Sequence, residues 1–361
     1  TFAHTPPSGF KAINTSNLPT PTIKKPGLHF NPVIYTGSDD DAVSQSVTGV
    51  GFQPDLVWIK KRNAEAHNVV TDAVRGAHKT LNSNRNAIEV TDTYGVTAFG
   101  SDGFTVREQT SAGGQVNTGT LVSWNWKANG SGSSNEDGSI NTTATSANTT
   151  SGFSISTYTG TGSNATVGHG LGVTPSVILV KNRESATNWL VYSRNDATDY
   201  LVLNDTRAST DWDGAWNDTA PTSSVFSIGN ATGNNTSGDD IVAYCFAEVE
   251  GFSKFGSYEG NNSSDGPFIN TGFRPAFLMV KSAGTTYDWK MYDNKRDPVN
   301  VVNQVLEAST SDAENAANST ICDFYSNGFK LRGNGAAVNA NNITYLYMAF
   351  AEAPFKYANA R

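Results

Sequence analysis

The most regular feature of the chain is a turn followed by a run of apolar residues, which occurs three times. It stands at residues 51–60 (GFQPDLVWIK), 172–181 (GVTPSVILVK) and 272–281 (GFRPAFLMVK). Each copy begins with a Gly-x-x-Pro turn signal and ends on lysine. A short apolar run rich in β-branched and aromatic residues predicts a buried strand. We expect the closing lysine to mark the point where each strand reaches the surface.

Other landmarks recur around this pattern in the same order. The prolines of the pattern are 121 and 100 residues apart, and Phe104, Phe226 and Phe329, which follow them, are 122 and 103 residues apart. A period near 100 residues is longer than the roughly 20–50 residues of solenoid and propeller units, and it suits a β-sandwich. Turn signals separate about seven or eight short strands in each copy. The sequence therefore predicts an all-β fold of three tandem, jelly-roll-like β-sandwich repeats.

These landmarks divide the chain into five parts. We expect an extended proline-rich arm at 1–31, β-sandwich repeat 1 at 32–128, a linker rich in Gly, Ser, Asn and Thr at 129–151, repeat 2 at 152–251 and repeat 3 at 252–361. Prolines make the arm semi-rigid, whereas the linker, which has no aromatic residue, predicts a flexible or turn-rich connector. An arm of this kind is expected to connect to an upstream domain. Apolar spacing over 299–307 favours one helical interruption.

Composition excludes several classes of protein. Aromatic residues make up 11% of the chain, which is enough to build cores. The net charge of −8 argues against nucleic acid as a partner, because phosphate binding needs a basic face. No stretch approaches 18 apolar residues, so no membrane span is expected. The only two cysteines, Cys245 and Cys322, exclude a disulfide framework, and Cys245 is predicted to be a buried thiol.

The sequence holds no motif that is typical of catalysis. His169 lies between glycines, but no Gly-x-Ser-x-Gly motif accompanies it, and we expect it to be a loop residue. Glu248 and Glu352 stand at equivalent ends of two repeats, which favours a structural role. Trp189 and Trp289 also occupy matched positions and are predicted to belong to the core. We therefore expect neither enzymatic activity nor a cofactor.

Short acidic clusters are the candidates for metal binding. They comprise Asp39, Asp40 and Asp41 in one turn, and Asp239 and Asp240 in another. Closely spaced carboxylates in a loop can bind calcium, which takes six to eight oxygen ligands. No EF-hand spacing is present, so solvated loops are the alternative interpretation.

Aromatic residues in a polar stretch are the candidates for ligand binding. Trp212 and Trp216 lie among polar residues, with Asp211 and Asp213 on either side of Trp212. An exposed tryptophan beside aspartate could stack on a sugar or anchor a protein partner. The alternative is that both tryptophans cap a sandwich or seal a domain interface.

Three phrases of the sequence resemble a known group of proteins. They stand at residues 6–19 (PPSGFKAINTSNLP), 246–258 (FAEVEGFSKFGSY) and 351–358 (AEAPFKYA). The first resembles the segment that follows an upstream SPRY-like β-sandwich in large virion proteins of tailed marine phages. The other two resemble downstream repeats of the same proteins, and the similarity covers essentially the whole chain. It implies a phage structural component, with the SPRY-like domain lying before Thr1, and it assigns no catalytic residue.

The resemblance leaves three classes of function. The first is a non-enzymatic tail fibre or receptor-binding adhesin of the virion, which contacts a glycan or protein on the host surface. The second is a capsid decoration or head-fibre protein docked on the shell, and the third is a carbohydrate-active enzyme or lectin module. For either virion role we expect other virion proteins as partners and a symmetric homo-oligomer.

Overall fold

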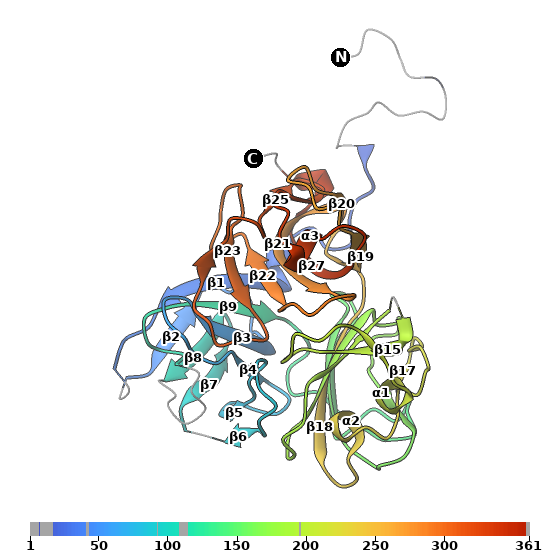
Figure 1. Ribbon diagram of the computed structural model, residues 1–361. Helices are drawn as coiled ribbons and strands as arrows, with labels where there is room; N and C mark the ends of the chain where they lie inside the picture. Colours follow the sequence, from blue (N-terminus) through green and yellow to red (C-terminus); the bar gives the residue numbers. More distant parts are fainter. Residues whose placement is uncertain are drawn as a thin grey trace.

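The computed structural model describes residue 7 and residues 17–40, 43–91, 93–107, 115–194 and 196–358. These residues form antiparallel strands joined by turns, so the predicted all-β class is confirmed. Figure 1 shows three lobes, coloured blue to teal, green to yellow and orange to red, which meet at a common centre. We call the corresponding stretches segment 1 (30–126), segment 2 (144–246) and segment 3 (253–354). The remainder of the predicted arm, 1–6 and 8–16, lies outside the described residues.

Segment 1 follows a short 3-10 turn, η2 (Pro26–Leu28), and consists of two sheets and a hairpin. Its main sheet has the order β1 (Phe30–Thr36), β9 (Thr120–Trp126), β3 (Leu56–Lys61), β4 (Val69–Asp72). Its second sheet has the order β2 (Gln45–Thr48), β8 (Gly103–Arg107), β7 (Gly95–Gly100). The hairpin pairs β5 (Lys79–Thr80) with β6 (Val90–Thr91).

Segment 2 has a longer main sheet and a second sheet of two strands. The order of the main sheet is β10 (Ala144–Asn148), β11 (Phe153–Thr159), β18 (Asp240–Phe246), β13 (Val177–Asn182), β14 (Leu190–Ser193), β15 (Asp196–Val202), β16 (Thr210–Asp211). The second sheet pairs β12 (Ala165–Gly168) with β17 (Val225–Ile228). Two single helical turns complete the segment, α1 (Asp213–Trp216) and α2 (Thr232–Asn235).

Segment 3 has a six-stranded main sheet and a three-stranded second sheet. The main sheet has the order β19 (Ser253–Glu259), β27 (Thr344–Pro354), β21 (Phe273–Ser282), β22 (Lys290–Asp293), β23 (Gln304–Glu307), β24 (Asn315–Ala316). The second has the order β20 (Phe268–Asn270), β26 (Gly328–Leu331), β25 (Cys322–Tyr325). The segment also contains α3 (Ala336–Asn339), and η3 (Phe355–Tyr357) follows it.

One expectation about local structure is wrong, and another is incomplete. The predicted helix over 299–307 is not formed, because Val302 makes a β-bridge with Cys322 and the residues after it enter strand β23. The connector expected to be flexible or turn-rich, 129–151, has turns in its first part, but it also contains strand β10, which pairs with β11 along its whole length. Threonine and serine fit a strand whose side chains are half solvated, so the polar composition of the connector concealed an edge strand.

The three main sheets share one strand order. In each, one strand (β1, β11 or β19) pairs with the last strand of the segment, that strand pairs with the strand of the ten-residue pattern, and a short strand follows; segment 2 adds β10 outside β11. The pattern itself forms the third of these strands: β3, β13 and β21. Equivalent residues can therefore be compared between segments by counting from the prolines at 54, 175 and 275.

Side chains of the three pattern strands alternate between two buried faces. In β21, Phe277 and Met279 join a cluster to which all three segments contribute, whereas Leu278 and Val280 join a cluster confined to segment 3. Strands β3 and β13 divide their side chains in the same way. Because successive side chains of a strand point to opposite faces, a strand covered on both sides needs apolar residues at consecutive positions. This double burial explains the uninterrupted apolar runs.

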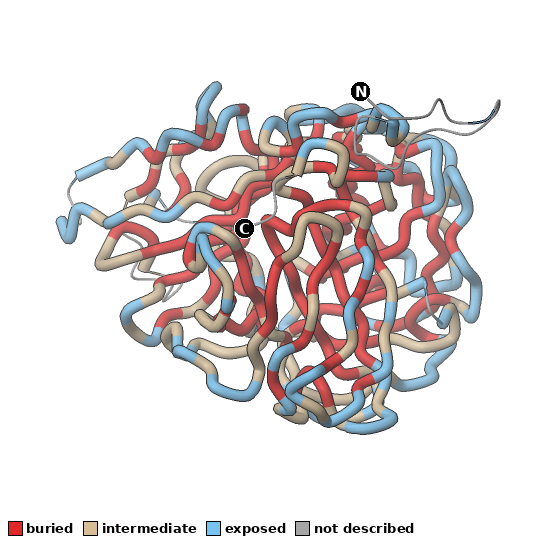
Figure 2. The backbone as a smooth tube through the Cα atoms, turned by 90° about the horizontal axis from the view of Figure 1, so that it is seen from above, coloured by how far each residue is buried: buried red, intermediate tan, exposed pale blue. Residues whose placement is uncertain are grey.

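The cluster that the segments share is a central aromatic core. Phe350 of segment 3 lies against Phe30 and Trp126 of segment 1 and Phe246 of segment 2, with ring centroids 4.8, 5.6 and 6.0 Å apart. Buried stretches of chain run through the middle of the molecule in Figure 2. Each segment also has an internal cluster between its main and second sheets, as a sandwich should. The sequence did not reveal that the segments are joined by a further core.

The lysines that close the three patterns are buried, contrary to expectation. Lys60, Lys181 and Lys281 are each 0% exposed, because they lie on the strand face that points toward the neighbouring segment. The ammonium group of Lys281 donates to the carbonyls of Tyr287 and, in segment 2, Thr206, at 2.6 and 2.7 Å. The lysines therefore satisfy backbone carbonyls that the contact between segments removes from water.

A second donor recurs eight residues after each lysine. Asn68, Trp189 and Trp289 occupy these positions and donate side-chain N–H groups across the contact to another segment. The acceptors are the carbonyls of Thr310, Asn82 and Val202, each at 2.9 Å. Segment 1 thus donates to segment 3, segment 3 to segment 2 and segment 2 to segment 1, so the contacts close a ring. Trp189 and Trp289 are buried, as predicted.

We predict that the central core makes the three segments unfold together. The ring of Phe277 lies against Phe30, Trp124 and Trp126 of segment 1, so Phe277→Ala should lower the free energy of unfolding by about 3–5 kcal/mol. Hydrogen exchange of the variant should show protection falling together in all three main sheets. Faster exchange confined to segment 3 would contradict a common core.

Burial of Lys181 gives a second prediction. Loss of hydration lowers the pKa of its ammonium group from 10.5 to about 7 in the folded protein. Between pH 7 and 10.5 the unfolded chain therefore binds more protons, and stability rises with pH. From pH 7 to pH 9, the free energy of unfolding of the natural protein should rise by up to about 2 kcal/mol more than that of Lys181→Met. Urea titrations at the two pH values measure this difference, and equal rises in both proteins would exclude it.

Candidate functional site

An open groove lies beside Trp212, where segment 2 approaches segment 1. Its volume is about 290 Å³. Strand β15, helical turn α2 and the loop between β13 and β14 build most of the wall, and segment 1 adds one residue. The lining residues are Asn86, Ala186, Thr187, Asn188, Leu190, Tyr200, Trp212, Thr232 and Gly233. We call this feature the Trp212 groove.

Local backbone structure sets the position of the Trp212 indole. Strands β15 and β16 form a hairpin, and Trp212 directly follows it at the N-cap of α1. The Trp212 ring meets Tyr200 edge to face, with centroids 5.3 Å apart. A Cβ on Gly214 would come within 2.5–2.7 Å of three indole atoms, so the absence of a side chain there lets the indole lie over the helical turn. The indole is 40% exposed and forms one wall of the groove.

The two tryptophans that the sequence suggests as binding residues lie in different environments. Trp216 is 1% exposed and lies in the internal core of segment 2, where its ring meets Tyr192 with centroids 5.7 Å apart. It therefore belongs to the core, and its assignment to the binding site is wrong. Trp216 ends the single turn that Trp212 caps, and this turn directs its side chain inward. Asp211 and Asp213 are exposed on either side of Trp212, but neither lines the groove.

The carboxylates proposed as calcium ligands already interact with other groups of the protein. Asp39 accepts the backbone N–H of Gly119 at 2.8 Å. Asp239 accepts hydrogen bonds from Asn182 and Ser185 at 2.8 and 2.6 Å. The groups that bind Asp240 are the Thr159 hydroxyl and the Arg183 guanidinium, at 3.3 and 3.5 Å. Asp40 also has an interaction partner, and Asp41 lies outside the described residues. Among the described residues, no three His, Cys, Asp or Glu side chains gather in a way that could hold a metal.

Groups with strongly shifted pKa values do not line the Trp212 groove. Burial raises the pKa of the Cys245 and Cys322 thiols, and both cysteines are free and buried. His169 lies in the loop after β12, as predicted, but it is 0% exposed, and burial lowers its pKa. Its Nδ1 accepts the N–H of Leu171, which leaves Nε2 to donate to the carbonyl of Thr222. These three side chains contribute to packing.

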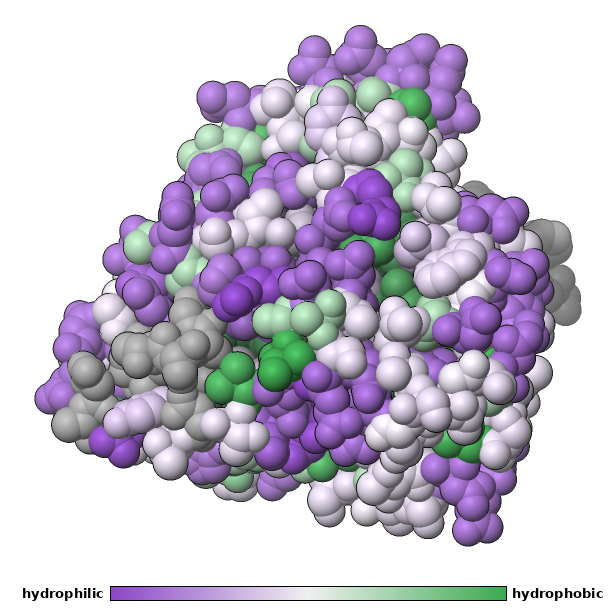
Figure 3. Space-filling model, turned by 60° about the horizontal axis from the view of Figure 1, so that its bottom comes forward, coloured by the Kyte–Doolittle hydropathy of each residue, from purple (hydrophilic) through white to green (hydrophobic). Residues whose placement is uncertain are grey.

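A second cavity, of about 410 Å³, opens where segment 2 meets segment 3. It lies between β15 and the ends of β21 and β27, and no pattern in the sequence predicts it. On the face shown in Figure 3, the described residues present hydrophobic side chains in small separate groups among hydrophilic ones. This face therefore shows no broad apolar area.

Together these features define an all-β protein of three main sheets around a shared core, with an aromatic groove at one contact between segments and a cavity at another. The chain belongs to the family described as Domain of unknown function (DUF7483), whose model matches residues 25–354. The match includes all three segments and both recesses. No curated protein matches the chain. Among the described residues, no helix has the length and apolar character needed to cross a membrane.

The exposure of Trp212 can be tested by fluorescence quenching. The chain has seven tryptophans, and the other six are buried. Acrylamide should therefore quench chiefly the emission of Trp212, and Trp212→Phe should remove most of the quenchable fraction. The matched variant Trp216→Phe should leave that fraction in place. Equal quenching of natural protein and Trp212→Phe would mean that the indole is not exposed.

Proposed function

We propose that this chain is a non-enzymatic structural component of a tailed-phage virion and acts as an adhesin, with the Trp212 groove holding a sugar ring of a host-surface glycan. The observation that carries the binding role is the exposed Trp212 indole in a groove otherwise lined mainly by amide and hydroxyl side chains. Most of the large aromatic side chains of segment 2 are buried, so an indole left at the surface calls for a ligand.

The chemistry of the groove suits a carbohydrate. A pyranose ring has an apolar face of C–H groups and a rim of hydroxyls, which match a flat aromatic wall and polar side chains respectively. Asn86 and Asn188 offer amide groups, and Thr232 offers a hydroxyl. Amides and hydroxyls both donate and accept hydrogen bonds, as sugar hydroxyls require. Segment 3 has no equivalent site, because the residue three positions after Glu314 is Ala317, whereas Trp212 stands three positions after the matched Ser209.

Assignment to a virion rests on the sequence. The phrases at 6–19, 246–258 and 351–358 resemble large virion proteins of tailed marine phages, and the chain carries no nucleophile, phosphate-loop or zinc-ligand motif. Imaging of intact particles with an antibody against this chain tests the assignment. Label on the tail supports adhesion. Label on the shell would replace adhesion with capsid decoration, and particles without label would exclude the virion role.

Glycan binding should depend on Trp212. When the purified chain is screened against host-surface polysaccharides and their oligosaccharides, Trp212→Ala should weaken binding by about 2 kcal/mol, roughly thirtyfold in the dissociation constant. Gly214→Ala should also weaken binding, because its Cβ displaces the indole without removing it. Titration calorimetry with the best oligosaccharide provides the measurement.

The control is an aromatic residue of similar exposure outside the groove. Phe268 is 46% exposed in segment 3, and Phe268→Ala should leave glycan affinity unchanged. If natural protein and Trp212→Ala bind every glycan equally, the groove is not the binding site. Degradation of a polysaccharide by the pure protein would instead establish an enzyme.

A further inference from the structure

The three contacts between segments share one backbone hydrogen bond. The N–H groups of Glu89, Glu314 and Ser209 donate to the carbonyls of Arg183, Arg62 and Ala283, at 2.7, 2.8 and 2.8 Å respectively. These bonds join segment 1 to segment 2, segment 3 to segment 1, and segment 2 to segment 3. The recurring bond lets the three contacts be compared position by position.

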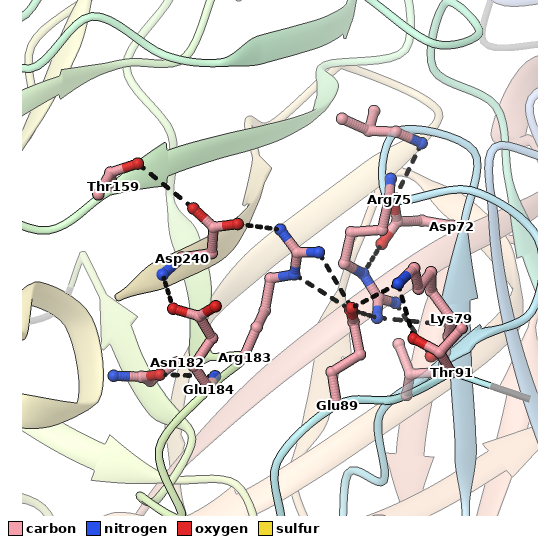
Figure 4. Close-up of polar contacts among 12 residues, drawn as sticks. Asp72, Arg75, Lys79, Glu89, Thr91, Thr159, Asn182, Arg183, Glu184 and Asp240 are labelled. Atoms are coloured by element: carbon pink, nitrogen blue, oxygen red, sulfur yellow. Dashed lines mark hydrogen bonds and ion pairs between the residues drawn. The ribbon is translucent and has the colours of Figure 1, made fainter. Parts of the chain in front are cut away.

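At the contact between segments 1 and 2, the side chains around this bond form a buried chain of charges (Figure 4). Arg183 binds Glu89 at 3.0 Å, Glu89 binds Arg75 at 2.9 Å, and Arg75 binds Asp72 at 2.5 Å. The hydroxyl of Tyr244 donates to Asp72 at 2.7 Å. Two guanidinium groups and two carboxylates therefore neutralise one another.

The contact between segments 3 and 1 repeats this arrangement. Arg62 binds Glu314 at 2.7 Å, Glu314 binds Arg296 at 3.1 Å, and Arg296 binds Asp293 at 2.6 Å. The indole N–H of Trp124, which stands at the position equivalent to Tyr244, donates to Asp293 at 3.1 Å. The same polar chain thus fills two of the three contacts.

At the contact between segments 2 and 3, none of the side chains of this charge network is present. Ala283 and Asp196 stand where the two arginines would be, and Ser209 and Ser193 stand where the two carboxylates would be. Met348 replaces the aromatic donor. The backbone hydrogen bond remains, but the side chains that fill the other two contacts are missing.

The cavity of about 410 Å³ occupies this place. Its lining includes all four substituted positions, Ser193, Asp196, Ser209 and Ala283, together with Asp199. Leu201, Ile343 and Leu346 supply an aliphatic wall. The volume lies within the range of small-ligand pockets, which is about 300–1,000 Å³. We call it the 2–3 cavity.

We propose that the 2–3 cavity binds a ligand that bears a guanidinium group on an aliphatic stem. Such a ligand would occupy the space that arginine side chains fill at the two other contacts. Free arginine derivatives and an arginine side chain presented by a partner protein share this chemistry. The site is separate from the Trp212 groove and does not depend on glycan binding.

The charges around the cavity favour a cation. Asp196 and Asp199 both line it, and among the described residues no basic side chain forms an ion pair with either. Arg194, two residues before Asp196 in the chain, is bound by Glu248 at 3.2 Å. Hydrogen bonds from the backbone and hydroxyl of Thr198 lower the pKa of Asp196, so this carboxylate is charged at neutral pH. The cavity therefore presents negative charge that its own walls leave uncompensated.

Geometry favours a guanidinium over a compact ammonium ion. A guanidinium carries five N–H donors in a planar fork and accepts no hydrogen bond, so it can contact carboxylates and hydroxyls at the same time. The side-chain oxygen atoms that line the cavity for such contacts include those of Asp196, Asp199, Ser209 and Thr344. The methylene groups of the stem would lie against the aliphatic wall.

Titration calorimetry with agmatine tests the proposal directly. We expect binding with a dissociation constant of roughly 1 mM or below, as few atoms contribute. Binding should be at least about tenfold weaker for 1,4-diaminobutane, which has the same stem and charge as agmatine but an ammonium group in place of the guanidinium. A blocked Gly-Arg-Gly peptide distinguishes the sources: tighter binding than agmatine indicates an arginine of a partner protein, and weaker binding indicates a small molecule. Absence of binding by both guanidinium probes overturns the proposal.

Two sets of variants locate the site. Ala283→Arg with Ser209→Glu rebuilds the ion pair of the other two contacts, and it should abolish agmatine binding while the protein stays folded with an equal or higher Tm. Asp199→Asn should weaken binding by about tenfold, whereas Asp218→Asn, at an exposed carboxylate of segment 2 that does not line the cavity, should not. Unchanged affinity in the rebuilt variant would show that agmatine binds elsewhere.

Trp212→Ala separates this proposal from the proposed function. It should leave agmatine affinity unchanged, because Trp212 does not line the 2–3 cavity. A loss of agmatine binding in Trp212→Ala would contradict the 2–3 cavity as the site.

Discussion

The architecture depends on three strands that are buried on both faces. One face of β3, β13 and β21 packs against the second sheet of its own segment, and the other packs into the core that all three segments share. A main sheet that lost its neighbours would expose, for example, the side of Phe277 that now faces Trp124 and Trp126 of segment 1. The hydrophobic effect therefore makes each segment depend on the other two.

Burying a sheet against a neighbouring segment also removes backbone carbonyls from water, and each must keep a hydrogen-bond donor. Lysine ammonium groups supply some of these donors, and the side-chain N–H groups of Asn68, Trp189 and Trp289, which donate from one segment to another, close the ring. A charged lysine in such a place loses hydration, which lowers the pKa of Lys60 and Lys281 to about 8. The lysine has the same role in each of the three segments, because an ammonium group on a long side chain reaches carbonyls that no backbone N–H can reach.

The sequence predicted the elements better than their assembly. Consecutive apolar residues at 272–281 show that a strand is buried on both faces, but they do not show that another segment covers one of them. For the same reason Lys281 was expected at the surface. A charged side chain is expected to be exposed unless its hydrogen-bond partners are known. Trp212 was found because it stands in a polar stretch, and Trp216 was grouped with it wrongly because sequence spacing does not show where a single helical turn directs a side chain. The 2–3 cavity exists because smaller side chains stand at the positions that hold the ion pairs in the other two contacts. It is therefore apparent only when the three contacts are compared position by position.

The shared core explains why one contact can lose its ion pairs. Removing one partner from a buried pair is costly because the other charge stays buried and uncompensated, whereas the one charge among the four replacing residues, Asp196, is exposed to solvent. At the contact between segments 2 and 3 the whole set has changed together, and the aromatic core and the hydrogen bond from Ser209 to Ala283 still hold the segments in register. The common core and the two contacts that keep their ion pairs therefore hold the three segments together. The third contact is not needed for this purpose and can accommodate the proposed ligand.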